Sequence, residues 1–132
     1  MATDMTASLR ARYLADSVTT ASPGRLLVLL YDRLVLDLGQ AEEALRAGDR
    51  ETGGARLTHA QEILIELRST LDLDVWDGAA GLAALYGFLI AELITANVRA
   101  DADATATCRA LVEPLRDAWR EVALIPAPAL AA

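Results

Sequence analysis

Residues 20–45 read TASPGRLLVLLYDRLVLDLGQAEEAL and contain both the start signal and the inner stripe of a long helix. Ser22 can accept hydrogen bonds from the free N–H groups of a first turn, and Pro23 suits the first helical position, where no N–H is needed. Gly48 is placed to end the helix. Apolar residues recur between these signals at alternating steps of four and three: Leu27, Tyr31, Leu34, Leu38, Ala41 and Leu45. The pattern predicts a helix over residues 23–47.

The same periodicity predicts three further helices, over residues 50–71, 78–98 and 102–122. The residues expected to cap them are carboxylates: Asp49, Asp77, and Asp101 or Asp103. The expected inner stripes are Leu57, Ala60, Leu64, Leu67 and Leu71 in the second helix, Leu82, Leu85, Leu89 and Leu93 in the third, and Cys108, Leu111, Leu115, Ala118 and Val122 in the fourth.

Two features interrupt these patterns. Gly53 and Gly54 together cost the second helix about 2 kcal/mol relative to two alanines, so its first turn is expected to fray or to begin late. Pro114 lies inside the fourth helix and removes one backbone hydrogen bond, so a kink is expected near Ala110.

The fold class predicted is all-α, because Leu and Ala dominate a chain of 132 residues, the size of one domain (residues 1–132). Short loops between long helices make sequential helices antiparallel, which gives an antiparallel up-down four-helix bundle. Residues 1–20 are expected to form a short N-terminal capping segment laid on the bundle, and residues 124–132 a flexible tail. The large apolar residues of the N-terminal segment form a one-sided pattern: Leu9, Tyr13, Leu14 and Val18.

The charge balance bears on partners and location. Nineteen acidic residues face twelve arginines, so the surface is anionic and nucleic-acid binding, which relies on clustered cations, is not expected. The single cysteine, Cys108, can form no internal disulfide, and the N-terminus lacks the apolar core of a signal peptide. No apolar run approaches the roughly 18 residues that a membrane span requires. We therefore expect a cytoplasmic protein without membrane insertion.

Several large apolar residues lie off the inner stripes. Leu29 and Leu36 point about 160 to 180° away from the stripe of their helix, so they should face outward. A continuous exposed apolar band usually marks a contact surface. We expect Leu29 and Leu36 to contact either the N-terminal segment or another chain. Four further residues flank the second and third stripes and are candidates for the same surface: Ile63, Ile65, Phe88 and Ile94.

Catalysis and cofactor binding have little support in the sequence. A di-iron bundle needs two inward Glu-x-x-His pairs, whereas this chain has one histidine, His59, three residues before Glu62 and without a second copy. Cys108 lies on an expected inner stripe, so we interpret it as a small buried hydrophobic residue. We expect no enzyme activity, no cofactor and no metal.

Four segments resemble the flagellar secretion chaperone family FliS, whose pattern they follow in order and at the right distances. The first joins an isolated tyrosine, Tyr13, to the turn and helix VTTASPGRL of residues 18–26 and to Leu30-Tyr31-Asp32. The others read AQEILIEL at residues 60–67, LAALY at residues 82–86 with Ala96-Asn97, and LRDAWRE at residues 115–121. The resemblance spans about residues 13 to 122.

This resemblance implies a non-enzymatic chaperone with a four-helix bundle fold. It would bind the C-terminal helical segment of flagellin in the cytoplasm, prevent premature polymerisation and assist delivery to a flagellar export gate component. The partner-binding residues then expected are Tyr13, Leu14, Leu29, Leu36, Ile63, Ile65, Phe88 and Ile94. The alternative is a structural bundle that self-associates, for example as a homodimer, and has no client.

Truncation of residues 1–18 tests the expected capping segment. By analogy with the family, the segment around Tyr13 covers part of the client surface and moves when the client binds. Truncation should therefore change client affinity, measured by calorimetry, while the helical circular dichroism signal stays nearly intact. Collapse of that signal would count against a displaceable cover.

Overall fold

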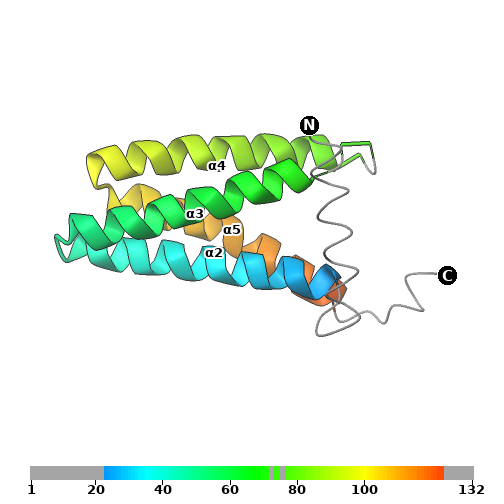
Figure 1. The fold of residues 1–132 in the computed structure, drawn as a ribbon, viewed down its shortest axis with the longest axis horizontal. Coiled ribbons are helices and arrows are strands. Elements are labelled where there is room, and N and C mark those ends of the chain that lie inside the picture. Colours follow the sequence, from blue (N-terminus) through cyan, green and yellow to red (C-terminus); the bar gives the residue numbers. More distant parts are fainter. Residues whose placement is uncertain (1–22, 72, 75–76, 124–132) are drawn as a thin grey trace.

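The computed structural model describes residues 23–71, 73–74 and 77–123, and four helices contain most of them. They are α2 (Pro23–Arg46), α3 (Arg50–Thr70), α4 (Ala79–Arg99) and α5 (Ala102–Ala123), which lie side by side along the long axis (Figure 1). Each end lies within one residue of the end expected from periodicity. Ser22, the expected cap of the first helix, lies outside the described residues.

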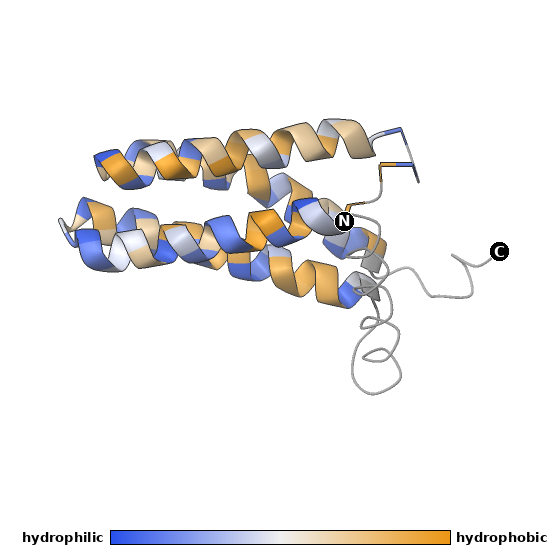
Figure 2. Ribbon diagram, turned by 45° about the horizontal axis from the view of Figure 1, so that its top comes forward, coloured by the Kyte–Doolittle hydropathy of each residue, from blue (hydrophilic) through white to orange (hydrophobic). Residues whose placement is uncertain are grey.

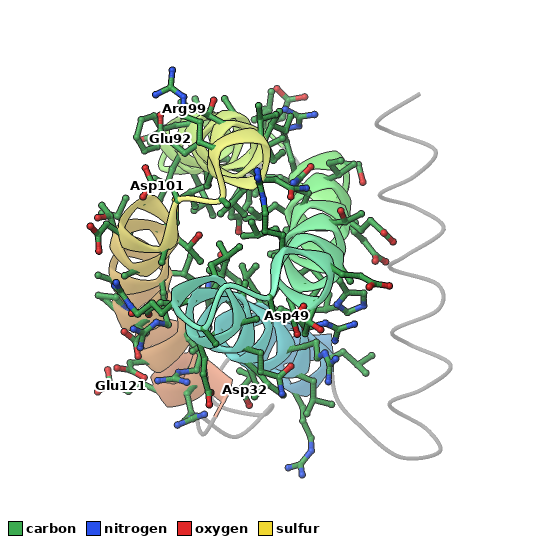
Figure 3. All side chains as sticks on the ribbon, turned by 90° about the vertical axis from the view of Figure 1, so that its left-hand side faces the viewer. Asp32, Asp49, Glu92, Arg99, Asp101 and Glu121 are labelled. Atoms are coloured by element: carbon green, nitrogen blue, oxygen red, sulfur yellow. The ribbon has the colours of Figure 1, made fainter. Side chains whose placement is uncertain are left out.

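The helices form a square in which each contacts two neighbours. α2 packs on α3 and α5, and α4 packs on the same two helices, so α2 and α4 occupy opposite corners. Figure 3 looks along the bundle and shows the labelled charged side chains around the outside of this square. Because the connections are short, sequential helices run antiparallel. The expected antiparallel up-down bundle is confirmed; the capping segment proposed for residues 1–20 lies outside the described residues.

The core is built from the inner stripes of all four helices. Leu34, Leu38, Leu57, Leu89 and Leu93 have no solvent exposure. Full burial of each such leucine contributes about 1.5–3 kcal/mol, so the stripes supply the main driving force for folding. Around this centre lie partly buried apolar residues from the ends of the stripes: Leu27, Leu45, Leu71, Leu82, Leu85 and Leu115.

The expected inner stripe of α5 is partly wrong. Leu111 and Val122 are 41% and 42% exposed, whereas Val112 is 1% exposed and Thr105 is fully buried. The inward positions of α5 therefore run through 105, 108, 112, 115 and 119. The sequence pattern takes a step of three after Cys108 and again after Leu115, where the helix takes steps of four, so Leu111 and Ala118 are exposed instead of buried.

Three expectations about helix ends can be compared with the structure. Asp49 caps α3, because its Oδ1 accepts a hydrogen bond from the Thr52 N–H at 3.1 Å. Asp101 does the same for α5, accepting from the Ala104 N–H at 3.0 Å. The expectation for Asp77 is wrong, since α4 follows Gly78, which offers no side-chain cap.

The glycine pair does not delay α3, which begins at Arg50 and continues through both residues. Gly53 is buried, and a Cβ there would lie 2.5 Å from Leu45 Cδ2. Gly53 thus allows a close approach of α3 to α2, which explains a residue that is otherwise unfavourable in a helix. The expected late start of this helix is wrong, and the start expected at residue 50 is confirmed.

Polar side chains tie α2 to both of its neighbours. Asp37, fully buried on α2, pairs with the Arg33 Nε at 3.3 Å, the Arg56 guanidinium at 3.4 Å and His59 Nδ1, and the last two come from α3. On the other side, ion pairs join α2 to α5: Glu42 with Arg109, Arg46 with Asp103, and Asp32 with Arg120. A buried carboxylate needs such partners, because its desolvation is otherwise costly.

The Asp37 cluster should contribute measurably to stability. We expect Asp37→Asn to lower the free energy of unfolding by about 1–3 kcal/mol, since the buried carboxylate loses its charge while its cations stay partly buried. The matched change Asp32→Asn removes the charge from a partly exposed carboxylate, which pairs with Arg120 and Arg116, and should cost no more than about 1 kcal/mol. Urea unfolding followed by circular dichroism measures both; equal effects would show that burial of Asp37 is unimportant.

Candidate functional surface

The outward side of α4 carries an uncharged surface that is unusual for a bundle helix. Phe88, Ile94 and Val98 are 52%, 49% and 74% exposed. Figure 2 shows hydrophobic colouring along most of α4. We call this surface the α4 face and define it by the exposed residues of the helix that precede Arg99: Ala80, Gly81, Ala84, Phe88, Ala91, Ile94, Thr95 and Val98.

α4 is apolar on both of its sides. Its inward side chains, including Tyr86, Leu89 and Leu93, are buried, and its only charged residues are Glu92 and Arg99. A surface helix normally carries charged and polar residues on its solvent side. At about 1.5 Å per residue, α4 presents apolar surface over roughly 30 Å.

The composition of α4 corrects one expectation from the sequence. The helix is long and apolar enough, by length and composition alone, to cross a membrane, so the expectation that no stretch approaches that length is wrong. The core helix of a soluble protein passes the same test. Here 33% of the stretch is buried inside the bundle. Packing in the core explains the inward half of this hydrophobicity and leaves the outward half unexplained.

The predicted contact residues fall on two separate surfaces. Ile65 on α3 is 46% exposed and belongs with Phe88 and Ile94, because α3 packs directly on α4. Leu29 and Leu36, 51% and 46% exposed, lie on the outside of α2, at the opposite corner of the square. The structure therefore separates this α2 pair from the α4 face.

Ile63 requires a correction. It is only 5% exposed and belongs to the core, so the expectation that it faces outward beside Ile65 is wrong. At about 100° per residue, Ile63 lies roughly 80° from the centre of the inner stripe on the side of α2, whereas Ile65 lies roughly 120° away. Tyr13 and Leu14, the remaining predicted contacts, lie outside the described residues.

Sequence reasoning missed part of the surface. Val98, the most exposed large apolar residue of α4, and Leu111 and Val122 on α5 were not among the candidates. A readable signal existed for Val98, because positions 84, 88, 91, 95 and 98 follow helical steps of three and four without a charged residue. For the α5 residues there was none, since the sequence pattern placed them in the core.

The polar groups behind this surface are buried. The hydroxyl groups of Tyr31 and Tyr86 are hydrogen-bonded to each other, and the Trp119 ring lies 6.4 Å from that of Tyr31. Burial raises the pKa of both phenols, and for Tyr86 the neighbouring Tyr31 raises it further. Both stay neutral at physiological pH. The pair joins α2 to α4 within the core and offers no acid or base to solvent.

Cys108 and His59 have structural environments as well. Burial, and then the charge of Glu92, raises the pKa of the Cys108 thiol to about 11, so the reactive thiolate is scarce at neutral pH. His59 pairs with Asp37. Within residues 23–71, 73–74 and 77–123, no group of three or more His, Cys, Asp or Glu side chains is arranged to hold a metal ion.

Together these features define an all-α bundle that keeps an uncharged helix face at its surface. Comparison with known proteins identifies its family: the model of the flagellar protein FliS matches residues 5–126, so the chain belongs to the FliS family. The flagellar secretion chaperone FliS of Bacillus subtilis (strain 168) is 32% identical over 109 residues, covering 83% of this chain and 81% of the relative. The protein of that name from Escherichia coli (strain K12) is 31% identical over 113 residues, covering 84% and 83%.

Adjacent residues of α4 provide a test that the surface is not required for folding. We expect Phe88→Ala to change the free energy of unfolding by no more than about 1 kcal/mol, because the ring is half exposed. Leu89→Ala should cost about 2–5 kcal/mol, since it empties a fully buried site. Chemical denaturation measures both. A cost for Phe88→Ala as large as that for Leu89→Ala would mean that the ring is part of the core.

Proposed function

We propose that this protein is a flagellar secretion chaperone and that its α4 face holds the C-terminal helical segment of flagellin before export. The observation that carries the assignment to this surface is the absence of charge from the exposed side of α4 before Arg99. Membership of the FliS family, whose relatives are named flagellar secretion chaperones, supports the chaperone role.

The binding mode follows from the shape of the surface. A client segment that forms an amphipathic helix can lay its apolar side along the roughly 30 Å of α4, as in other helix-in-groove complexes. The client gains on α4 the apolar burial that it would otherwise find in a growing filament. Premature polymerisation is prevented because the same side of the client helix cannot be buried twice.

Magnitudes explain why the whole face is needed. Covering the exposed parts of Phe88, Ile94 and Val98 contributes about 3–5 kcal/mol, from about 1.5–3 kcal/mol per fully buried large side chain. Ordering a disordered client costs about 2–5 kcal/mol, which nearly cancels that contribution. Net affinity then depends on the alanine positions of the α4 face and on Ile65, so the contact must be extended.

The remaining functional assignments are part of the proposal. The chaperone must bind flagellin before export, while flagellin is still in the cytoplasm, so we expect the chaperone to act in the cytoplasm. Delivery requires a second contact, with a component of the export gate. The outward pair Leu29 and Leu36 is suited to that contact, because it lies at the corner opposite α4 and stays accessible while a client covers the α4 face.

Calorimetric titration with the C-terminal helical segment of flagellin from the same organism tests the proposal. Phe88→Asp and Ile94→Asp should each weaken binding at least about tenfold, equivalent to about 1.4 kcal/mol, because a charge would be buried against an apolar helix. Leu36→Asp is the matched control, with a similar exposure on the opposite corner, and should change affinity less than about twofold.

Circular dichroism establishes that each variant is folded. Unchanged affinity in a folded Phe88→Asp or Ile94→Asp variant would remove the α4 face from the client site. A wild-type chain that fails to bind the segment and sediments as a dimer closed over α4 would instead support a self-associating bundle without a client.

A further inference from the structure

An arginine without a partner lies beside the middle of the α4 face. Arg68 is an exposed residue of α3, one turn beyond Ile65. Its Nη1 atom lies 3.8 Å from the position that a Cβ on Gly87 would occupy. The guanidinium therefore reaches from α3 across to α4 and lies one turn from Ala91 along that helix.

Almost every other arginine of the described ranges has a polar partner. The ion-paired ones are Arg33, Arg46, Arg56, Arg109, Arg116 and Arg120. Arg50 donates to the Val98 carbonyl at 3.2 Å, and Arg25 has a partner as well. Within residues 23–71, 73–74 and 77–123, the side chains of Arg68 and Arg99 have neither an ion pair nor a hydrogen bond.

The two differ in position. Arg99 lies in the last turn of α4, where a cation interacts favourably with the helix dipole, and it marks the end of the α4 face. Arg68 also lies in the last turn of α3, but its guanidinium extends over the neighbouring helix. A role limited to the helix dipole does not require that placement.

Charge indicates what Arg68 can bind. The protein carries a formal net charge of −7, so a carboxylate is repelled over most of its surface. The free guanidinium of Arg68 lies beside an uncharged helix face, so a carboxylate is attracted there instead of repelled. A helix lying on the face would exclude water from the arginine, and a planar guanidinium can then hold a carboxylate through two hydrogen bonds.

We propose that Arg68 is a specificity-determining contact of the α4 face and pairs with an Asp or Glu on the bound client helix. The inference rests on the proposed function. Apolar contacts repeat at every helical turn, so they allow a client to shift by a turn, about 5.4 Å, at little cost. One charge pair at a fixed position selects a single register and disfavours helices that lack the acidic residue.

A double-mutant cycle with the flagellin C-terminal segment tests this pairing. Arg68→Gln should weaken binding roughly three- to thirtyfold, and the loss should shrink at high salt. In the segment, each acidic residue is changed in turn to its amide. One of these changes should weaken binding to the wild-type chain and have no further effect on Arg68→Gln. Arg99→Gln is the matched control and should bind as the wild type does.

Gly87 permits a second test in the opposite direction. Its Cβ would make only an ordinary contact with the mobile end of Arg68, so the site accepts a side chain. Gly87→Asp supplies a carboxylate within the chain, which should occupy Arg68 and reduce client affinity to the level of Arg68→Gln. Gly87→Ala adds a Cβ without charge and should bind as the wild type does.

The outcomes separate this inference from the proposed function. If the wild-type chain binds the segment and Phe88→Asp does not, equal affinity of wild type and Arg68→Gln overturns the pairing alone. The pairing also fails if no acidic position of the segment couples to Arg68, or if Arg68→Gln lowers only the stability of the chaperone. Absence of binding by the wild-type chain overturns both.

Discussion

Burial of the inner stripe of α4 is the interaction on which the rest of this structure depends. Leu89 and Leu93 have no solvent exposure and belong to the core cluster, and burial of leucines of this kind contributes about 1.5–3 kcal/mol each. This attachment lets α4 remain apolar on its outward side as well. Without it, a helix of this composition would associate with other apolar surfaces in water.

The polar contacts between helices differ in the same way between α4 and the other three helices. Ion pairs join α2 to α3 through Asp37 and to α5 through Glu42 and Asp32. Among the described residues, no ion pair reaches α4, and its polar links to other helices are the Tyr31–Tyr86 hydrogen bond and the Arg50 contact with the Val98 carbonyl. Charges fix three helices in their places, and the fourth is left with a surface that an apolar helix can cover.

Much of the fold could be predicted from the sequence. The helical period located all four helices, and Asp49 and Asp101 cap α3 and α5 as their positions suggested. The candidate surface was predicted less completely. Ile65, Phe88 and Ile94 are exposed as expected, but Ile63 is not, and Val98 was missed. Asp37 was missed as well, because a carboxylate gives no sequence signal of burial when its partners come from another helix.

The sequence by itself determined the helices and the apolar composition of α4, because hydrogen bonding and periodicity act within one segment. Only the tertiary structure decided which flank of each stripe is covered. A residue some 80° from the stripe centre is buried if a neighbouring helix lies on that side, and exposed otherwise. The same packing placed Leu29 and Leu36 on the far corner from α4 and brought Arg68 against Gly87. These arrangements depend on where separate helices meet, which no single segment encodes.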